Sequence, residues 1–393
     1  MLNALIAEEP LGNQGDVPVL YLHAKAGIYW RISTTNEAVH CTDVQLEAML
    51  RRRNVLRVLA AQYERKEEKL RSSGLSLPVR DVHQLPAIHL QQMIYSGNSD
   101  IFSATFQQGG VNRNAVLKLM AATSHRAWKE LRLQKRHAPG PRTPAPIPGL
   151  VPLLHACVAN FKGLAQIGLV FPRKDADLQQ VIERSGSFSS SGVEDFLRQL
   201  SEILSRLLVM NVSMRDLKPA NVLCDMDPAR PSGHKFYISD LDSAAEAKSW
   251  DAACGTKRWL SPEMLQRQIE GGDDEVDGEA LDVWGLGSLA YYCLTGKAPY
   301  DSLYPDDADS GQSDEAEEAE ALRLVLAAMQ KEGWREHSAD LPAISPRLRN
   351  MVGLMLAADP AVRIGMDHLA RGVRRWQPLP LPPAPPAAAA GFL

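Results

Sequence analysis

Residues 214–221 of this chain read MRDLKPAN, and residues 238–242 read ISDLD. The two segments supply a carboxylate at Asp216, an ammonium at Lys218, a carboxamide at Asn221 and a second carboxylate at Asp240. A carboxylate can orient a hydroxyl group and accept its proton, and amide and carboxylate oxygens are ligands that Mg²⁺ prefers. This set of groups therefore suits phosphoryl transfer, in which catalysis is mostly positioning and charge neutralisation.

The length and the cysteines limit the class of protein. With 393 residues and 45% hydrophobic content, the chain can bury a sizeable core and form two or three domains. Its five cysteines have no paired spacing, which argues against a zinc site or a disulfide framework and indicates a reducing compartment. We find no basic leader and no apolar stretch of about 18 residues. We expect a soluble intracellular protein, cytoplasmic or nuclear.

The charges are balanced overall but unevenly placed. Lys and Arg total 43 and Asp and Glu total 47, so no strong basic field favours nucleic acid or an anionic membrane as partner. Residues 270–279 hold six carboxylates and residues 301–320 hold nine. The rest of the chain consequently carries about +11.

Composition divides the chain into four regions. Residues 1–88 are predicted to be an extension of unknown role. Residues 374–393 form a tail rich in proline and alanine, whose composition predicts disorder. Within the extension, apolar alternation predicts strands at 19–23 and 28–34, and helical spacing predicts a helix over 43–71. The charged face of that helix is either a solvated surface or a docking element.

Between these regions the pattern changes from strand to helix. The predicted strands are 101–106, 115–120, 150–158 and 165–171, with a turn at Gly109-Gly110, a helix over 124–136 and a proline-rich loop over 139–148. Helical signals dominate after residue 175. A mostly β part followed by a mostly α part predicts two lobes rather than an alternating βαβ sheet.

The two quoted segments resemble signatures of the eukaryotic protein kinase family, and the resemblance covers roughly residues 89–373. MRDLKPAN resembles H-R-D-x-K-x-x-N, and Asp240-Leu241-Asp242 resembles D-F-G. The resemblance implies an α+β, bilobal fold with ATP and Mg²⁺ (or Mn²⁺) bound between the lobes. The small, mainly β N-lobe would span 89–173 and the larger, mainly α C-lobe 174–373. Asp216 would be the catalytic base, Lys218 the cation that stabilises the transition state, and Asn221 and Asp240 the metal ligands.

Further motifs follow in the order that the family requires. Residues 115–118, AVLK, resemble V-A-I-K, so Lys118 would contact the α- and β-phosphates, with Glu130 as its partner. Residues 261–263 resemble A-P-E, residues 282–287 resemble D-x-W-x-x-G, and Asp359-Pro360 precedes Arg363. The resemblance implies that Glu263 pairs with Arg363 and that Asp282 braces the backbone of the catalytic loop.

Nucleotide contacts are expected at two further places. Residues 95–100, YSGNSD, retain only the middle glycine of G-x-G-x-x-G, Gly97, whose position allows the closest approach of backbone to phosphate. Residues 169–174 fit the strand that leads into the hinge. Phe171 would lie behind the adenine, Pro172 would offer its carbonyl and Lys174 its N–H.

Three departures from the family pattern bear on activity. Asp100 brings a carboxylate toward phosphate, Met214 replaces the motif histidine, and Asp242 replaces the glycine after Asp240. If position 242 needed positive φ, a non-glycine residue would cost about 1–2 kcal/mol. None of the three removes a group that handles protons, metal or phosphate, which favours an active enzyme. The alternative is a pseudokinase scaffold that keeps the fold with weak or no catalysis.

The substrate class and the regulation follow from smaller features. Lys218-Pro219 and Gly255-Thr256 resemble serine/threonine kinases, so a protein hydroxyl is the expected acceptor and a small-molecule kinase is disfavoured. Thr256 is expected to bond near Asp216. Arg215 would receive an anion, for which Asp251 could supply a fixed charge in place of a phosphate. Ser243 and Ser249 remain alternative phosphosites.

The acidic runs and the tail each leave two interpretations open. Residues 270–279 and 301–320 flank the predicted peptide-binding lobe, where they are either solvated insertions or the basis of a preference for basic residues near the phosphoacceptor. The proline-rich tail is either disordered or a docking segment for a proline-reading partner.

Overall fold

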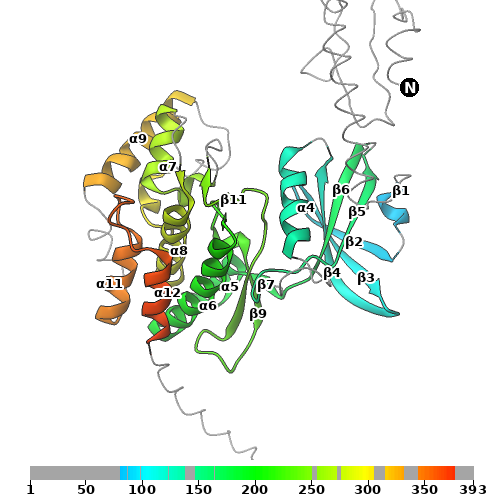
Figure 1. The fold of residues 1–393 in the computed structure, drawn as a ribbon, viewed down its shortest axis with the longest axis horizontal. Coiled ribbons are helices and arrows are strands. Elements are labelled where there is room, and N and C mark those ends of the chain that lie inside the picture. Colours follow the sequence, from blue (N-terminus) through cyan, green and yellow to red (C-terminus); the bar gives the residue numbers. More distant parts are fainter. Residues whose placement is uncertain are drawn as a thin grey trace, which may run out of the picture. The chain divides into compact units, whose positions relative to one another are not determined.

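The computed structural model describes residues 80–85, 87–97, 99–122, 124–137, 147–162, 164–249, 255–271, 276–304, 315–331 and 344–376. The strands and the helix predicted within residues 19–71, and the proline-rich residues after 376, lie outside these ranges. The chain divides into two compact units (Figure 1). Unit 1 comprises Met1–Ala138 and Pro152–Arg173, and unit 2 comprises Pro139–Val151 and Lys174–Leu393.

Unit 1 is built on a sheet. In its described part, six strands follow the order β1-β5-β6-β4-β3-β2, and all neighbours are antiparallel except β1, which is parallel to β5. The strands are β1 (Arg80–Asp81), β2 (Ile88–Ser96), β3 (Asp100–Gln108), β4 (Val111–Ala121), β5 (His155–Phe161) and β6 (Leu164–Pro172). Helix α4 (His125–His137) is the α-helix described in this unit.

Each face of the sheet has its own apolar cluster. Trp128 and Leu131 of α4 pack with Ile167 and other sheet residues on one face. On the other face, Val82 from the short helix η2 (Val82–Gln84) and Leu85 pack with strand residues that include Leu117. Residues 82–85 therefore cover the face opposite α4, so the end of the N-terminal extension is part of this core.

The strand predictions are largely confirmed, with two differences. The ranges 101–106, 115–120 and 165–171 lie within β3, β4 and β6, and the helix predicted over 124–136 is α4. Strand β2 was not predicted, because most of its residues are exposed and give no apolar alternation. The strand predicted over 150–158 begins only at His155. The preceding residues bond elsewhere: Val151 N donates to Ile238 O at 3.0 Å in unit 2.

Unit 2 is mainly helical, as predicted for the larger lobe. Its helices are α5 (Leu178–Ser185), α6 (Ser190–Val209), α7 (Pro262–Glu270), α8 (Gly278–Thr295), α9 (Glu315–Lys331), α11 (Pro346–Met355) and α12 (Met366–Arg374). Helix α8 lies at the centre, buried along almost its whole length and in contact with α6, α11 and α12. The Asp277 carboxylate accepts from Glu279 N and Ala280 N and so caps the N-terminus of α8.

Unit 2 also contains short strands and 3₁₀ helices between its α-helices. Strand β9 (Val222–Met226) lies between β10 (His234–Ile238) and β7 (Ala176–Asp177). The remaining short elements are β8 (Val212–Ser213), β11 (Ala245–Glu246), β12 (Lys248–Ser249), β13 (Val276–Asp277), η3 (Pro219–Asn221), η4 (Lys257–Trp259) and η5 (Asp301–Leu303). No helix in the described ranges is long and apolar enough to cross a membrane.

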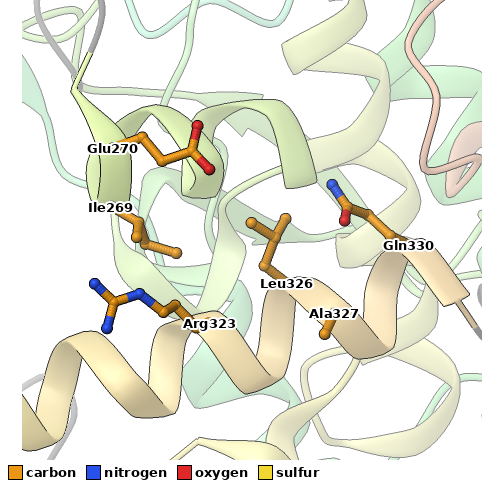
Figure 2. A pocket seen from close by; sticks show the side chains of 6 residues that line it. All are labelled: Ile269, Glu270, Arg323, Leu326, Ala327 and Gln330. Carbon is orange, nitrogen blue, oxygen red and sulfur yellow. The ribbon is translucent and has the colours of Figure 1, made fainter.

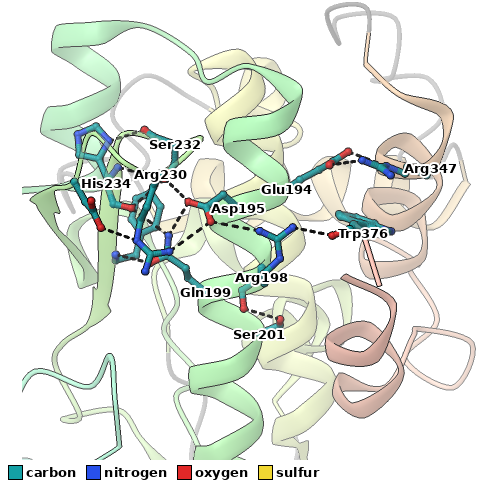
Figure 3. Close-up of polar contacts among 12 residues, drawn as sticks. Glu194, Asp195, Arg198, Gln199, Ser201, Arg230, Ser232, His234, Arg347 and Trp376 are labelled. Atoms are coloured by element: carbon teal, nitrogen blue, oxygen red, sulfur yellow. Dashed lines mark hydrogen bonds and ion pairs between the residues drawn. The ribbon is translucent and has the colours of Figure 1, made fainter. Parts of the chain in front are cut away.

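Helix α6 also holds the last described residues (Figure 3). Arg347 of α11 donates two hydrogen bonds to the buried Glu194 carboxylate, with Nε 3.0 Å from Oε1. Arg198 Nη2 donates to Trp376 O at 3.2 Å, and the Arg347 guanidinium lies 5.5 Å from the Trp376 ring centroid. The chain is thus fixed to unit 2 up to Trp376.

We predict that Leu85→Ala lowers the free energy of unfolding by about 2–4 kcal/mol, because it opens a cavity in a sealed cluster. Leu85 is 7% exposed, whereas Leu324 of α9 is 62% exposed, so Leu324→Ala is the matched control and should have little effect. Urea denaturation followed by fluorescence measures both. Equal stability losses in the two variants would show that residues 82–85 do not seal the sheet.

Candidate active site

A buried carboxylate holds the 214–221 loop. Asp282 of α8 is 1% exposed, and it accepts hydrogen bonds from Met214 N at 2.9 Å and from Arg215 N at 2.8 Å. Burial raises the pKa of Asp282 to about 6, while the bonds from the two backbone N–H groups act in the opposite direction. The loop backbone is consequently fixed to the core helix immediately before Asp216.

The side chain of Asp216 is held at both oxygens. Lys218 Nζ lies 2.9 Å from Asp216 Oδ2, and Thr256 Oγ1 donates to Asp216 Oδ1 at 3.0 Å. Lys218 Nζ also donates to Thr256 Oγ1 at 2.8 Å, which closes a three-membered network. The arrangement places a carboxylate, an ammonium and a hydroxyl within hydrogen-bonding distance of one another.

Gly255 allows the segment before Thr256 to approach this loop. Its φ is +106°, and a Cβ there would lie 2.6 Å from Leu260 Cδ2 and 3.3 Å from Arg215 O. A side chain would therefore push Thr256 away from Asp216.

The two predicted metal ligands are neighbours through the backbone. Ser239 N and Ser239 Oγ both donate to Asn221 O, at 3.0 and 3.1 Å, so the next residue, Asp240, lies close to Asn221. Asn221 Nδ2 donates to Asp216 O at 2.8 Å, which leaves the amide oxygen as the acceptor directed elsewhere. Sequence analysis did not single out Ser239, although it lies directly before Asp240.

These donors fit a hard divalent cation. An amide oxygen and a carboxylate are oxygen ligands, and Mg²⁺ usually takes its remaining ligands from substrate phosphates and water. In the described part of the chain, no three His, Cys, Asp or Glu side chains gather to hold a metal by themselves. The chemistry of Asn221 and Asp240 thus fits a hard divalent cation that takes further ligands from elsewhere.

In unit 1, Lys118 and Glu130 form a buried ion pair. Lys118 Nζ of β4 lies 2.8 Å from Glu130 Oε2 of α4, and the two side chains are 7% and 0% exposed. Strand alternation turns Lys118 to the α4 face, whereas Leu117 and Leu119 belong to the opposite cluster. The pair therefore fixes the ammonium relative to the sheet, and removal of either partner would leave a buried charge.

The turn between β2 and β3 contains Gly97. A Cβ at this position would lie 2.3 Å from Tyr95 Oη, so a side chain would displace Tyr95. Asp100 accepts a hydrogen bond from Ser96 Oγ at 2.6 Å and has Lys162 Nζ at 3.5 Å. Part of the Asp100 charge is thus engaged within unit 1, although Lys162 is well exposed and its contribution is small.

The predicted hinge residues end β6. Phe171 pairs with Val116 and packs against the cluster under α4, and Pro172 pairs with Ala115. Lys174 follows at the start of unit 2, where its Nζ lies 2.7 Å from Asp225 Oδ2 and 3.4 Å from the Tyr237 ring centroid. The Lys174 side chain has this structural role, so a ligand would use its backbone.

The condition under which Asp242 would be strained is not met. Asp242 is not among the described residues with positive φ, whereas Arg215 and Asp240 are, at +64° and +63°. The left-handed backbone lies on the first residue of the D-L-D segment, so position 242 has no steric need for glycine. Met214 is 1% exposed and packs in the core, and its N–H is the one held by Asp282.

An ion pair braces the far side of unit 2. Arg363 Nη1 lies 2.7 Å from Glu263 Oε1, and Arg363 Nη2 donates to Glu263 Oε2 at 2.9 Å. The Arg363 guanidinium also lies 5.1 Å from the Trp284 ring centroid. The implied pairing of Glu263 with Arg363 is present, and it joins α7 to the chain just before α12.

The predicted regulatory residues are only partly described. Asp251 and the side chain of Ser249 lie outside the described residues. Arg215 is 6% exposed, and Ser243 Oγ donates to Asp242 Oδ1 at 2.9 Å.

Two contacts to the loop after Thr256 were not predicted. Arg258 Nη1 lies 2.6 Å from Asp301 Oδ1, and Tyr304 Oη donates to Lys257 O at 3.0 Å. Both come from the start of the 301–320 acidic run. No short motif indicates them, because the partners are 43 and 47 residues apart.

A separate cavity of about 500 Å³ lies between α7 and α9 (Figure 2). It is lined by Ile269, Glu270, Arg323, Leu326, Ala327 and Gln330. Of the residues that the sequence analysis singled out, Glu270, the first carboxylate of the 270–279 run, lines it.

Comparisons with known proteins agree with this geometry. The protein kinase domain family model matches residues 153–372, more than half of the chain. The chain therefore belongs to the protein kinase family. The match begins at Leu153, in unit 1. The strand that carries Lys118 and the turn that contains Gly97 therefore lie before the matched region.

Curated relatives include serine/threonine kinases. The chain is 31% identical over 132 residues to the probable serine/threonine-protein kinase fhkD of Dictyostelium discoideum, covering 32% of this chain and 18% of that protein. It is 31% identical over 137 residues to human serine/threonine-protein kinase ULK1, covering 33% and 12%. For Arabidopsis thaliana SRK2D the identity is 27% over 197 residues, covering 49% and 47%. The chain thus spans less than half the length of each of these relatives.

The contribution of Asp282 to stability should depend on pH. Because burial raises its pKa from 3.8 in the unfolded chain to about 6, the folded state binds the proton more tightly. The stabilisation from Asp282 relative to Asn is then largest below pH 4 and is lost as the pH rises through 6, by about 3 kcal/mol for a shift of about two units.

Urea denaturation of wild type and Asp282→Asn between pH 4 and pH 7.5 measures this difference. Asp367→Asn, an exposed carboxylate on α12, is the matched control. A wild-type advantage over Asp282→Asn that stays constant across the range would contradict the prediction.

Proposed function

We propose that this protein is an active serine/threonine protein kinase that transfers the γ-phosphoryl group of ATP to a hydroxyl group of a protein substrate. The observation that carries the proposal is the network of Asp216, Lys218 and Thr256, with its three distances between 2.8 and 3.0 Å. A solvated R-D-x-K loop without a catalytic role would not need its carboxylate to be bonded by both an ammonium and a hydroxyl group.

In this proposal Asp216 orients the acceptor hydroxyl and takes its proton. Thr256 and Lys218 restrict the carboxylate to one rotamer, which reduces the cost of positioning it in the transition state. Lys218 neutralises charge that develops on the transferred phosphoryl oxygens. Asp282 acts indirectly, since it holds the backbone on which Asp216 stands.

The proposal assigns nucleotide contacts to residues of each unit considered by itself. Lys118, fixed by Glu130, contacts the α- and β-phosphates, and Gly97 lets the backbone approach them. Phe171, Pro172 and the backbone of Lys174 contact the adenine. Asn221 and Asp240 hold Mg²⁺ or Mn²⁺, which when bound neutralises charge on the phosphates.

We also propose how the enzyme is regulated and in which compartment it works. Arg215 is proposed to receive an anion, for which the sequence offers the fixed charge of Asp251, with Ser243 and Ser249 as alternative phosphosites. The described cysteines, Cys157, Cys224 and Cys293, are free and buried, which supports a reducing, intracellular compartment. A proline-reading partner for the tail remains a proposal from its composition.

We further propose that the protein substrate carries basic residues near the phosphoacceptor. The support is that the 301–320 acidic run starts at the loop after Thr256, through the Arg258–Asp301 and Tyr304–Lys257 contacts. Asp301 neutralises Arg258, which would otherwise repel a basic peptide at this loop.

The decisive experiment combines catalysis with nucleotide binding. Wild type should phosphorylate itself or a generic protein substrate, and its melting temperature should rise more with ATP plus Mg²⁺ than with ATP alone. Asp216→Asn should lower the phosphotransfer rate by about 10³-fold, because it removes the base, while it keeps the metal-dependent increment. Asp240→Asn should lose that increment.

A wild-type protein that shows the increment but no phosphotransfer would support the pseudokinase alternative. A protein that shows neither would exclude the active kinase and would leave the pseudokinase scaffold, which keeps the fold without needing nucleotide.

Peptide kinetics test the substrate preference. At low salt, kcat/KM for an arginine-containing peptide should exceed that for a neutral peptide, and the advantage should shrink as salt is added. Asp301→Asn should reduce the advantage about fivefold, since one charge near a peptide charge is worth about 1 kcal/mol. Asp367→Asn serves as the control, and equal efficiencies for the two peptides with wild type would exclude the preference.

A further inference from the structure

The outer edge of β10 is paired although no strand of the described residues lies beside it. Within the described sheet order β10-β9-β7, β9 bonds only one edge of β10. On the other edge, Ile238 N donates to Gly149 O at 2.8 Å and Val151 N donates to Ile238 O at 3.0 Å. The end of β10 nearest to Asp240 is thus held by residues 149–151.

The side chain of Gln199 pairs with the rest of this edge. Gln199 of α6 donates through Nε2 to His234 O at 3.1 Å and accepts through Oε1 from Phe236 N at 3.1 Å. A carboxamide has the same donor and acceptor as a peptide unit, so it reproduces two bonds of a β-ladder. Gln199 consequently acts as a substitute for a strand.

Asp195, one turn earlier on α6, sets the orientation of that carboxamide (Figure 3). Asp195 is 3% exposed, and its Oδ2 accepts from Gln199 Nε2 at 2.9 Å and from Ser232 Oγ at 2.6 Å. An ionised carboxylate only accepts hydrogen bonds, so Gln199 must turn its NH₂ group toward it. The Gln199 oxygen is then directed to Phe236 N.

This edge controls the position of both predicted metal ligands. Asn221 directly precedes β9, and Asp240 follows β10 by two residues. The two strands pair over five residues, from His234 opposite Met226 to Ile238 opposite Val222. A shift of β10 would therefore change the spacing of Asn221 and Asp240, and a misplacement of about 1 Å can cost about 100-fold in rate.

We propose that Asp195 and Gln199 are positioning residues for the divalent metal at Asn221 and Asp240, an inference that rests on the proposed kinase function. They touch neither metal nor nucleotide. They hold the outer edge of β10, so that the spacing of the two ligands does not depend on β9 alone.

Gln199→Met tests the proposal, because it keeps the length of the side chain and removes both edge bonds. The Mg²⁺ concentration that gives half of the nucleotide-dependent rise in melting temperature should increase about tenfold. Hydrogen exchange at the Phe236 amide should become faster, while KM for the peptide stays unchanged. Gln266→Met is the matched control, because Gln266 is an exposed glutamine of α7 whose side chain donates to Glu270 one turn later.

Asp195→Asn is the second variant. Its new NH₂ group can donate to the Gln199 oxygen, which would turn that oxygen away from Phe236 N. It should raise the Mg²⁺ requirement in the same direction. Faster exchange at Phe236 with an unchanged Mg²⁺ requirement, or loss of folding in both variants, would mean a role in stability alone and would overturn the proposal.

Measurements on wild type distinguish a failure of this inference from a failure of the proposed function on which it rests. If wild type shows no metal-dependent rise in melting temperature with nucleotide, the proposed function fails and the inference falls with it. If wild type shows the rise and Gln199→Met leaves its Mg²⁺ requirement unchanged, only the inference is overturned.

Discussion

The contact between the Asp282 carboxylate and the backbone of Met214 and Arg215 is the constraint on which the site in unit 2 depends. Helix α8 is buried along nearly its whole length, so Asp282 has a fixed position. Two backbone N–H groups bonded to one carboxylate fix both the place and the direction of the following residue. The left-handed φ of Arg215 then turns the chain, so that Asp216 meets Lys218 and Thr256.

Buried charges elsewhere link elements that are distant in the sequence. Lys118–Glu130 joins a strand to a helix, Glu263–Arg363 spans 100 residues, and Glu194–Arg347 spans 153. Of these three pairs, Lys118–Glu130 is buried at both partners, whereas the Glu263 and Arg347 side chains are 23% and 41% exposed. Burial of a charge in such a pair is weak evidence for stability, because desolvation offsets most of the attraction. Their common effect is to fix geometry, since a misplaced partner would leave an uncompensated charge in the core.

Sequence alone predicted the parts of the site that lie in short motifs. Asp216, Lys218 and Asn221 fall within eight residues, so their combined chemistry can be predicted without knowledge of the fold. The long-range pairs were predicted from the family resemblance. Gln199 and Asp301 could not be found in this way. Gln199 lies 35 and 37 residues from its partners. It bonds their backbone groups, which every residue type except proline offers, so the sequence at positions 234 and 236 does not indicate the contact.

The fold was predicted best where periodicity reflects burial. Strands β3 and β4 alternate between two covered faces and were predicted, whereas β2 is an exposed edge strand and was not. Residues 150–154 are apolar, yet Leu150 N donates to Ile147, Val151 N to Ile238 of β10 and Leu154 N to Val170 of β6, so they form no continuous strand. An apolar run specifies burial, and only hydrogen bonding decides whether it becomes a strand.

The departures from the family pattern fall where the structure needs backbone geometry rather than a particular side chain. Met214 contributes a buried side chain and a backbone donor, and Asp242 has no positive φ. Asp100 is engaged by Ser96 and Lys162. Each substitution therefore preserves the positions of Lys118, Asp216, Asn221 and Asp240. The joint presence of these four groups supports the proposed phosphoryl transfer rather than the scaffold alternative.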